Sequence, residues 1–401
     1  MFSKVSLVAA ILTLAGTTAA AASPSASPSA APSNIPPPLI PLSPFNGTFS
    51  ITFPDPSKIA PTDTPEAKKW IAELNLTGVP SFPVVSVNSN GDVLNPSSVP
   101  TDACDWSVTN CLNKDLVTCP LGVWGLTYDD GPTEASPKLY DFLDKTNQKA
   151  TLFYIGGNVV QNWQSARRAC GAGHHIASHT WSHKMSTSLT NEQFIAEVKY
   201  TEMAIKEVCG FTPTYFRPPY GDIDNRIRGL LWAMGYTAVI WDYDTNDWDT
   251  CPGGKTTVST VDASFAKWIA DAPTDKTGHM TLEHELCASS VDLAIAHLPQ
   301  LQATWKTMPV SACMNNSHPY KEQSITLATM DGAKTGVNNN GGNSSTGTTT
   351  TSAGPASPSG SSNMTGKTGS GAVSAFRLTE DAKAVAMVAV TAAVALVQIL
   401  I

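Results

Sequence analysis

The sequence has no cluster of basic residues, and no two of its cysteines stand at the C-x-x-C spacing. Its 25 Lys and Arg are outnumbered by 33 Asp and Glu, which gives a formal net charge of −8 at pH 7. A nucleic acid is therefore not an expected partner, because its phosphates need basic side chains. The missing C-x-x-C pair argues against a metal site made of cysteines.

Both ends of the chain are biased in composition, and only the middle reads as an ordinary globular protein. Lys4, the mostly apolar residues 5–14 and the alanines at 19–22 follow the order of an export signal with its cleavage site. Segments rich in Ser, Ala and Pro, or in Gly, Asn, Ser and Thr, cannot bury a core and should form disordered tails. We expect a signal peptide (1–22), a spacer (23–44), an irregular N-terminal extension that packs on the main domain (45–118), the main domain (119–316), a linker (332–374) and an anchor signal (371–401).

The last 18 residues, 384–401, are apolar except for Thr391 and Gln398. A polar spacer precedes them, and the small residue Ser370 stands just upstream as the expected attachment site. This order is typical of a glycosylphosphatidylinositol (GPI) signal, whose tail is removed. A retained tail helix is the alternative, although no basic residue follows the run. Five N-glycosylation sequons agree with export: Asn46, Asn75, Asn315, Asn343 and Asn363.

Eight cysteines lie within the middle of the chain, at positions 104, 111, 119, 170, 209, 251, 287 and 313. Export makes four disulfides plausible, with free buried thiols as the alternative. Four bridges have 105 possible connectivities, and sequence alone does not choose among them. By position, we expect one bridge from Cys119 to Cys313 that closes the main domain.

The main domain alternates strands and helices. Short apolar runs predict buried strands at 123–128, 150–155, 215–217, 237–241 and 279–284. The clearest helix spans 191–208, where Thr190 and Gln193 form a capping box and Gly210 ends the periodic pattern. Alternation of this kind predicts an α/β fold with a mainly parallel sheet, closed or nearly closed into a (β/α) barrel.

Ionisable residues collect at the ends of the predicted strands, where barrel enzymes place their active sites. Asp129 and Asp130 follow one strand; adjacent buried carboxylates need a cation or a partner, although Asp-Asp-Gly-Pro also suits a solvated turn. The spacing of His179 and His183 brings two imidazoles to one face of a helical turn, as metal sites need, but it also arises by chance. One carboxylate with two imidazoles suits zinc, and iron or cobalt would also bind. The neighbouring His174 and His175 we interpret as structural.

Three further strand ends carry polar residues whose roles the residues alone leave open. Arg217 begins Arg-Pro-Pro-Tyr-Gly, in which two prolines fix the direction of the following amide at Tyr220, but the segment also suits a rigid turn. Asp244 begins a loop that ends at Trp248, and His284 ends an apolar strand, where a satisfied core histidine is the alternative. Four tryptophans near these segments either stack on a sugar or belong to the core, and the sequence leaves both roles open: Trp163, Trp181, Trp241 and Trp248.

Taken in order, these segments resemble the five motifs of the carbohydrate esterase family 4 deacetylases, also called the NodB homology domain. The motifs stand as Thr127-Tyr128-Asp129-Asp130, His179-Thr180-Trp181-Ser182-His183, Arg217-Pro218-Pro219-Tyr220, Asp244-Thr245-Asn246-Asp247-Trp248 and Leu282-Glu283-His284. The resemblance covers residues 119–316, and the whole chain is similar in arrangement to fungal GPI-anchored chitin deacetylases. Tyr128 stands where many members have Phe.

The resemblance implies a deformed (β/α) barrel, one divalent metal ion (Zn²⁺ or Co²⁺) and a role for each motif. Asp130, His179 and His183 would bind the metal. Asp129 would act as general base beside Arg217, and His284 as general acid paired with Asp244. The Tyr220 amide would help to bind the oxyanion, and Trp248 would line the site.

The implied reaction is removal of acetyl groups from N-acetylglucosamine in chitin, at a plasma membrane reached through a GPI anchor or at the cell wall. Acetylated xylan and peptidoglycan remain alternative substrates, because the motifs do not separate them. A non-catalytic chitin-binding wall protein would not need an acid and a base. A glycoside hydrolase would use two carboxylates and no metal.

Overall fold

The computed structural model describes residues 39–88, 93–332 and 334–337 of the chain. The predicted signal peptide, the anchor signal, Ser370, Asn343 and Asn363 lie outside these residues, as do most of the spacer and the linker. Within the described ranges, no helix combines the length and the apolar character needed to cross a bilayer.

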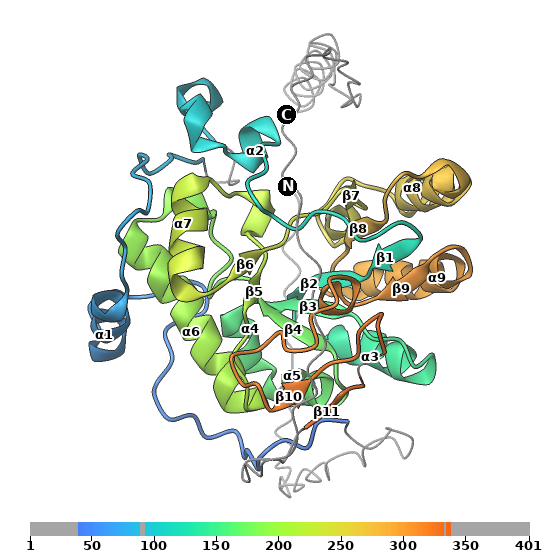
Figure 1. The fold of residues 1–401 in the computed structure, drawn as a ribbon, viewed down its shortest axis with the longest axis horizontal. Coiled ribbons are helices and arrows are strands. Elements are labelled where there is room, and N and C mark those ends of the chain that lie inside the picture. Colours follow the sequence, from blue (N-terminus) through green and yellow to red (C-terminus); the bar gives the residue numbers. More distant parts are fainter. Residues whose placement is uncertain (1–38, 89–92, 333, 338–401) are drawn as a thin grey trace, which may run out of the picture. The chain divides into compact units, whose positions relative to one another are not determined.

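Two parallel sheets form the centre of the main domain (Figure 1). The five-stranded sheet has the order β2-β3-β4-β5-β6, and the four-stranded sheet the order β7-β8-β1-β9. Their strands are β1 Val123–Gly125, β2 Thr127–Gly131, β3 Thr151–Tyr154, β4 His175–Ser178, β5 Tyr215–Phe216, β6 Thr237–Ala238, β7 Tyr243–Asp244, β8 His279–Leu282 and β9 Lys306–Met308. Asp129 of β2 forms a parallel bridge with His284 after β8, which joins the two sheets. The predicted α/β fold, a deformed barrel, is therefore confirmed.

Helices lie around the two sheets (Figure 1). They are α1 Pro65–Glu73, α2 Trp106–Thr109, α3 Ser136–Lys145, α4 Gly156–Gln161, α5 Trp163–Gly171, α6 Asn191–Cys209, α7 Asn225–Met234, α8 Val258–Asp271, α9 Ala288–Thr304 and α10 Val310–Cys313. The capping box of α6 forms as predicted, because the Thr190 side chain accepts from the Gln193 amide and the Gln193 side chain from the Thr190 amide. Gly210 ends α6 in the left-handed conformation.

Each of the predicted strand regions contains a strand, but the prediction did not include every strand of the main domain. The run at 123–128 is two strands, since the chain passes from one sheet to the other at Leu126. Three strands of the main domain were missed: β4, β7 and β9. β4 begins with His175 and ends with Ser178, and β7 has two residues, so neither shows an apolar run.

The N-terminal extension packs on the main domain as predicted. Its helix α1 lies against α6, and Phe53 stacks on Trp181 with ring centroids 5.4 Å apart. Packing also continues past residue 316, because Tyr320 and Leu327 are buried. A two-stranded antiparallel sheet of β10 (Ile325–Thr326) and β11 (Gly336–Val337) follows, so the first residues of the predicted linker are part of the packed structure.

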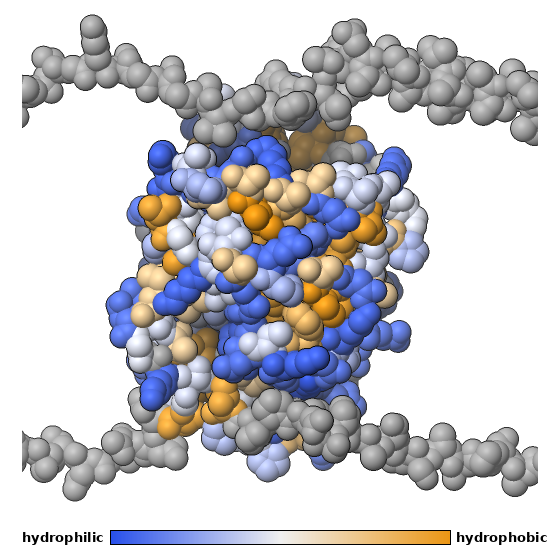
Figure 2. All heavy atoms as spheres, turned by 90° about the vertical axis from the view of Figure 1, so that its right-hand side faces the viewer, coloured by the Kyte–Doolittle hydropathy of each residue, from blue (hydrophilic) through white to orange (hydrophobic). Residues whose placement is uncertain are grey.

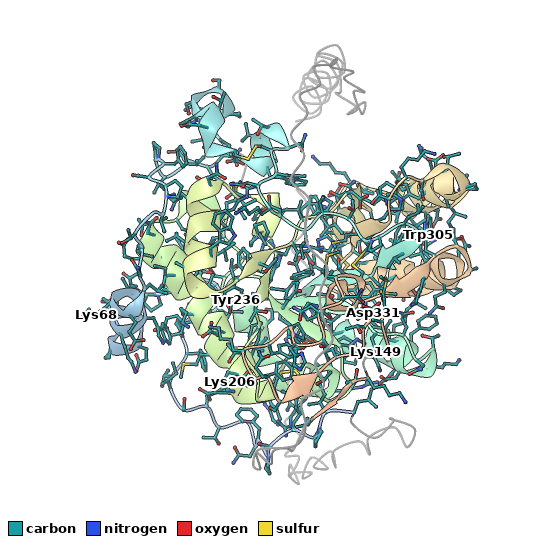
Figure 3. All side chains as sticks on the ribbon, in the orientation of Figure 1. Lys68, Lys149, Lys206, Tyr236, Trp305 and Asp331 are labelled. Atoms are coloured by element: carbon teal, nitrogen blue, oxygen red, sulfur yellow. A yellow bond between two sulfur atoms is a disulfide. The ribbon has the colours of Figure 1, made fainter. Side chains whose placement is uncertain are left out.

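All eight cysteines form disulfides: Cys104–Cys111, Cys119–Cys313, Cys170–Cys209 and Cys251–Cys287. Disulfides are drawn as yellow bonds between sulfur atoms in Figure 3. The predicted Cys119–Cys313 bridge is confirmed; it joins the residues before β1 to the end of α10, and so closes the main domain.

Trp124 of β1 packs against Trp305, labelled in Figure 3, with ring centroids 4.6 Å apart, and both belong to a core cluster that includes residues of α8 and α9. The surface on this side, seen in Figure 2, mixes hydrophilic and hydrophobic residues. Because parallel strands point the same way, their carboxyl ends meet at one edge of the barrel. The fold therefore gathers the segments that follow β2, β4, β5, β7 and β8.

Candidate metal and catalytic site

The predicted metal ligands come together at this edge. Asp130, His179 and His183 each offer a ligand atom, and these atoms lie within 4.8 Å of one another. Oδ1 of Asp130 lies 3.4 Å from Nε2 of His179 and 3.2 Å from Nε2 of His183. Nδ1 of His179 donates to the Arg217 carbonyl at 2.8 Å, which leaves Nε2 free to face the other two residues.

These residues fit a divalent cation. Oδ1 of Asp130 is buried and has no hydrogen-bond partner, which is costly for a carboxylate unless a cation compensates it. Burial by itself would raise the pKa of Asp130, but the interactions of its carboxylate with the His183 and His179 rings outweigh burial and lower the pKa. The pKa of His183 falls to about 4, because burial disfavours the charged ring. An ionised carboxylate and neutral imidazoles are the forms that bind zinc.

The loop between the two imidazoles is not the predicted helical turn. Residues 179–183 have no helical structure, and Thr180 and His183 have positive φ angles of 65° and 55°. Asp130 is also left-handed, with φ 69°. Non-glycine residues in this region are strained and concentrate at functional sites. The two imidazoles nevertheless meet, with ring centroids 4.9 Å apart, because the loop reverses direction after β4.

Asp129 and Arg217 form the predicted pair. Nη1 of Arg217 donates to Oδ1 of Asp129 at 2.8 Å, and both side chains are buried. Arg217 also donates to the Thr127 hydroxyl, and its guanidinium lies over the Phe153 ring. Burial lowers the pKa of Arg217, against the opposing charge of Asp129. The pair fixes the carboxylate at the end of β2.

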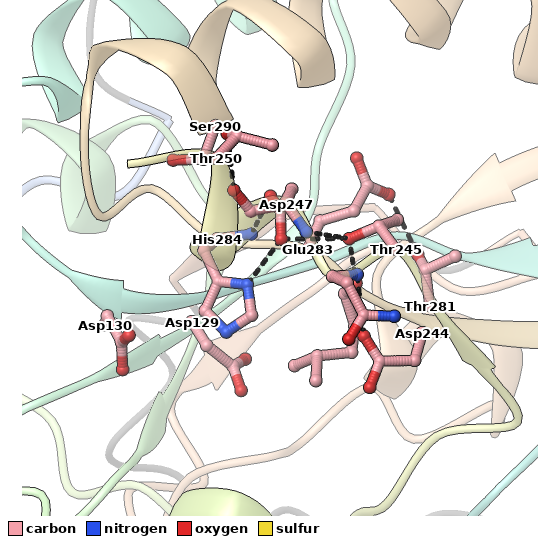
Figure 4. Close-up of polar contacts among 12 residues, drawn as sticks. Asp129, Asp130, Asp244, Thr245, Asp247, Thr250, Thr281, Glu283, His284 and Ser290 are labelled. Carbon is pink, nitrogen blue, oxygen red and sulfur yellow. Dashed lines mark hydrogen bonds and ion pairs between the residues drawn. The ribbon is translucent and has the colours of Figure 1, made fainter. Parts of the chain in front are cut away.

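The histidine at the other side of the site has a different partner from the one predicted. His284 donates from Nδ1 to Oδ1 of Asp247 at 2.6 Å, and its amide donates to Oδ2 at 2.8 Å (Figure 4). Burial would lower the pKa of His284, but the Asp247 carboxylate raises it to about 10. The predicted pairing of Asp244 with His284 is therefore wrong.

Asp244 instead accepts from the Asn246 amide at 2.8 Å. Asn246 is left-handed, with φ 55°, so the chain turns between the two aspartates and only Asp247 reaches the imidazole. Burial raises the pKa of Asp244. The motif was recognised in the sequence, but the contact with His284 was assigned to Asp244, its first aspartate, and is made by Asp247, its second.

The remaining predicted residues lie around the same edge. Tyr220 has φ 60° and is about half exposed, and its ring centroid lies 4.7 Å from that of His183. Trp248 is also about half exposed, on the short 3₁₀ turn Asp247–Thr250. The oxyanion contact of Tyr220 and the sugar contact of Trp248 stay predictions.

His174 and His175 are structural, as interpreted. Both are buried at the start of β4, where Nδ1 of His174 accepts from the Ala150 amide and Nδ1 of His175 hydrogen-bonds the Thr151 hydroxyl. Burial lowers the pKa of each to about 3, so both rings are neutral at ordinary pH. Trp181, Trp241 and Trp163 are core or partly buried packing residues.

The sequence analysis assigned no role to three buried acidic residues near the site: Glu197, Glu283 and Glu285. Burial raises the pKa of both Glu283 and Glu285 to about 8. A signal for Glu197 existed in the sequence, because it stands between Phe194 and Val198 on the apolar face of the predicted helix. An acidic residue on such a face needs a polar partner inside the protein.

Comparison with known proteins places these motifs in a family. The family described as "Polysaccharide deacetylase" matches residues 118–239. The chain is 40% identical over 276 residues to a chitin deacetylase of Amylomyces rouxii, covering 65% of each chain. It is 34% identical over 299 residues to chitin deacetylase 3 of Cryptococcus neoformans, covering 71% of this chain and 72% of that protein.

A solved structure, the chitin deacetylase of Colletotrichum lindemuthianum, is 27% identical with a TM-score of 0.48, covering 52% of this chain and 95% of that one. The chain spans 65% of the length of the Amylomyces protein and 64% of chitin deacetylase 1 of Cryptococcus neoformans. Since a third relative is matched over more than two thirds of its length, this chain belongs to the polysaccharide deacetylase family.

Proposed function

We propose that this protein removes acetyl groups from N-acetylglucosamine residues of chitin by hydrolysis, leaving chitosan and acetate. The arrangement of Asp129 and His284 carries the proposal. The two residues form a bridge between the two sheets, since the Asp129 amide donates to the Glu283 carbonyl at 2.9 Å. A buried acid–base pair beside a cation site suits hydrolysis of an amide. The names of the relatives support chitin as the polymer.

The cation is proposed to be Zn²⁺, with Co²⁺ as a possible substitute, held by Asp130, His179 and His183. When bound, it would supply Lewis-acid polarisation of the acetamide and acidify water. The chain's own residues supply the proton transfers. Asp129 takes the proton of the attacking water, and the hydrogen bond from Arg217 holds this carboxylate in position.

The leaving amine is a poor leaving group until it is protonated. His284 donates that proton, and Asp247 holds its ring by Nδ1 so that Nε2 is the donating atom. The Tyr220 amide donates to the oxygen that becomes negatively charged as water attacks, a contact typically worth about 3 kcal/mol. The exposed Trp248 ring offers a stacking face for a sugar ring.

We further propose that the chain enters the secretory pathway, carries a GPI anchor at Ser370, and acts at the plasma membrane or cell wall. The four disulfides fit an oxidising compartment. The sequon residues Asn46, Asn75 and Asn315 are exposed, as glycan attachment requires. Release of the protein from membranes by phosphatidylinositol-specific phospholipase C would test the anchor.

Acetate release from chitin oligomers by the full chain tests the reaction. The protein is compared untreated, treated with a chelator, and restored with zinc. We expect release that stops with the chelator and returns with zinc. If acetate were released only from acetylated xylan or peptidoglycan, that polymer and not chitin would be the substrate. If the polymer chain were shortened even in the presence of the chelator, the protein would be a glycoside hydrolase and not a deacetylase.

A further inference from the structure

The long helix α6 carries a buried acidic residue that faces the metal-site loop. Glu197 is 0% exposed, and Phe194, Val198 and Thr201 of the same helical face are equally buried. A carboxylate in such surroundings needs hydrogen bonds. Glu197 takes no part in the proposed proton transfers and is not one of the proposed metal ligands, so its role needs a separate explanation.

Glu197 accepts four hydrogen bonds, and three of them come from the loop between the two imidazoles. Its Oε2 accepts from the amides of Trp181 at 2.9 Å and Ser182 at 2.8 Å. Its Oε1 accepts from the Ser182 hydroxyl at 2.8 Å. The fourth donor, at 2.8 Å from Oε1, is the amide of Ala60 in the N-terminal extension.

The backbone of this loop is strained immediately before and after Trp181 and Ser182, the two residues that Glu197 binds. Thr180 and His183, with positive φ angles, flank Trp181 and Ser182. The carbonyls of Thr180 and Trp181 accept from the first amides of α4, while the amides of Trp181 and Ser182 point to Glu197. A strained loop persists only where its surroundings determine it. Glu197 supplies the acceptors on one side of this loop, and α4 the donors on the other.

The N-terminal extension contacts both the loop and Glu197. Phe53 stacks on Trp181 with an interplanar angle of 11°, and Trp181 donates from its indole to the Asp55 carbonyl at 3.4 Å. Since Ala60 hydrogen-bonds Glu197 directly, one extension segment contacts both the loop and the carboxylate beneath it.

We propose that Glu197 is a positioning residue that sets the separation of His179 and His183, and that residues 53–60 of the extension stabilise the same conformation. Metal affinity then depends on side chains that do not touch the metal. The inference rests on the proposed metal site, but not on the identity of the polysaccharide. Residues that orient metal ligands typically change affinity by about 10–100-fold when replaced.

Two substitutions at this position separate its contacts. Glu197→Gln can keep the oxygen that faces the two loop amides, and the Ser182 hydroxyl can turn to face the new amide group, so only the Ala60 contact is lost. Glu197→Ala removes all four contacts. The matched control is Glu192→Gln, in the first turn of the same helix, where the side chain is exposed.

The measurement is the zinc dissociation constant of the full chain, by competition with a chromophoric chelator, together with the visible spectrum of the Co²⁺ form and the melting temperature of the metal-free protein. We expect a rise in Kd of about 100-fold for Glu197→Ala and a smaller rise of about 10-fold for Glu197→Gln, with an altered cobalt spectrum in the former. The control should match the wild type. Wild-type affinity and spectrum in a folded Glu197→Ala protein would overturn the proposal.

If Glu197→Ala does not fold, Phe53→Ala and Glu197→Gln carry the test, and wild-type zinc affinity in both would overturn it equally. A purely structural role would lower the melting temperature of the metal-free protein and leave the Kd of the folded protein unchanged. Acetate release by the wild type is measured in parallel. Its absence, with a weakened Kd in the variants, would refute the proposed reaction and leave the role of Glu197 standing.

Discussion

Replacement of Asp247 by Asn should move the alkaline limit of activity to lower pH. In the structure, Asp247 accepts from the His284 ring at 2.6 Å and from its amide at 2.8 Å. Its charge is the largest influence that raises the pKa of His284, to about 10. Asp247→Asn keeps the shape of the side chain and removes that charge, so the imidazolium should lose its proton at lower pH.

The size of the shift follows from the hydrogen bond. A bond to a charged group contributes about 1.5–3 kcal/mol and a neutral one about 1 kcal/mol, so the imidazolium loses about 1–2 kcal/mol of stabilisation. One pKa unit corresponds to about 1.4 kcal/mol. We therefore expect the pKa of His284 to fall by about one unit, and the alkaline limb of the pH profile of kcat/KM to move to lower pH by the same amount.

Acetate release from chitin oligomers, measured across pH for the wild type, Asp247→Asn and Asp244→Asn, provides the assay. Asp244 is the matched control, because it belongs to the same turn, while the hydrogen bonds to the His284 ring and amide come from Asp247 and the Asp244 carboxylate accepts from the Asn246 amide; its more distant charge on His284 should give the smaller displacement. The reasoning would be refuted by a displaced alkaline limb in Asp244→Asn and an unchanged one in Asp247→Asn.

Three further predictions concern stability. Zinc added to the chelated protein should raise its melting temperature, since a ligand present at 1,000 times its Kd contributes about 4 kcal/mol. Burial raises the pKa of Asp222 to about 7, so the stability that this group contributes should be lost as pH rises from about 4 to 8 and the group ionises; across that range the melting temperature of the wild type should fall relative to that of Asp222→Asn. Replacing Cys251 and Cys287 by Ser should destabilise the protein by roughly 3–4 kcal/mol on the chain-entropy estimate for a 36-residue separation and lower kcat, since the bridge joins the segments that carry Asp247 and His284.

Each of these has a distinguishing control. Magnesium, which prefers oxygen ligands in octahedral geometry, should not replace zinc in the thermal assay. Asp222→Asn that melts with the same pH dependence as the wild type would contradict the role of its raised pKa. Removal of the Cys104–Cys111 bridge, which closes a separation of 7 residues in the extension, should cost less stability and leave kcat unchanged; a loss of kcat equal to that of the Cys251–Cys287 variant would contradict the positioning argument.

Local chemistry determined the elements that the sequence predicted well. The ends of α6 depend on Thr190, Gln193 and Gly210, which act within a few residues of one another. Strands β3 and β8 follow from short apolar runs. Parallel strands send the residues that follow them to one edge, so the placement of Asp129 and Asp130 could be predicted without knowing any contact. His179 and His183 follow β4, a strand that was not predicted, and their role came from the motif.

Choices between neighbouring residues needed the tertiary structure. Asp244 and Asp247 belong to one motif, and only the left-handed turn at Asn246 decides which carboxylate reaches His284. The helical turn predicted for the two imidazoles failed for a related reason. Their loop is held by Glu197, a residue of a different element, and by the extension.

The sequence by itself determined the residue types, the order of the motifs and the family, because chemistry and strand alternation are local properties of the chain. The tertiary structure decided the pairing of His284 with Asp247 and of Glu197 with the loop, because these contacts join residues that are far apart in the sequence. Such contacts depend on the register between strands and on the packing of α6, and no pattern within a single segment records either.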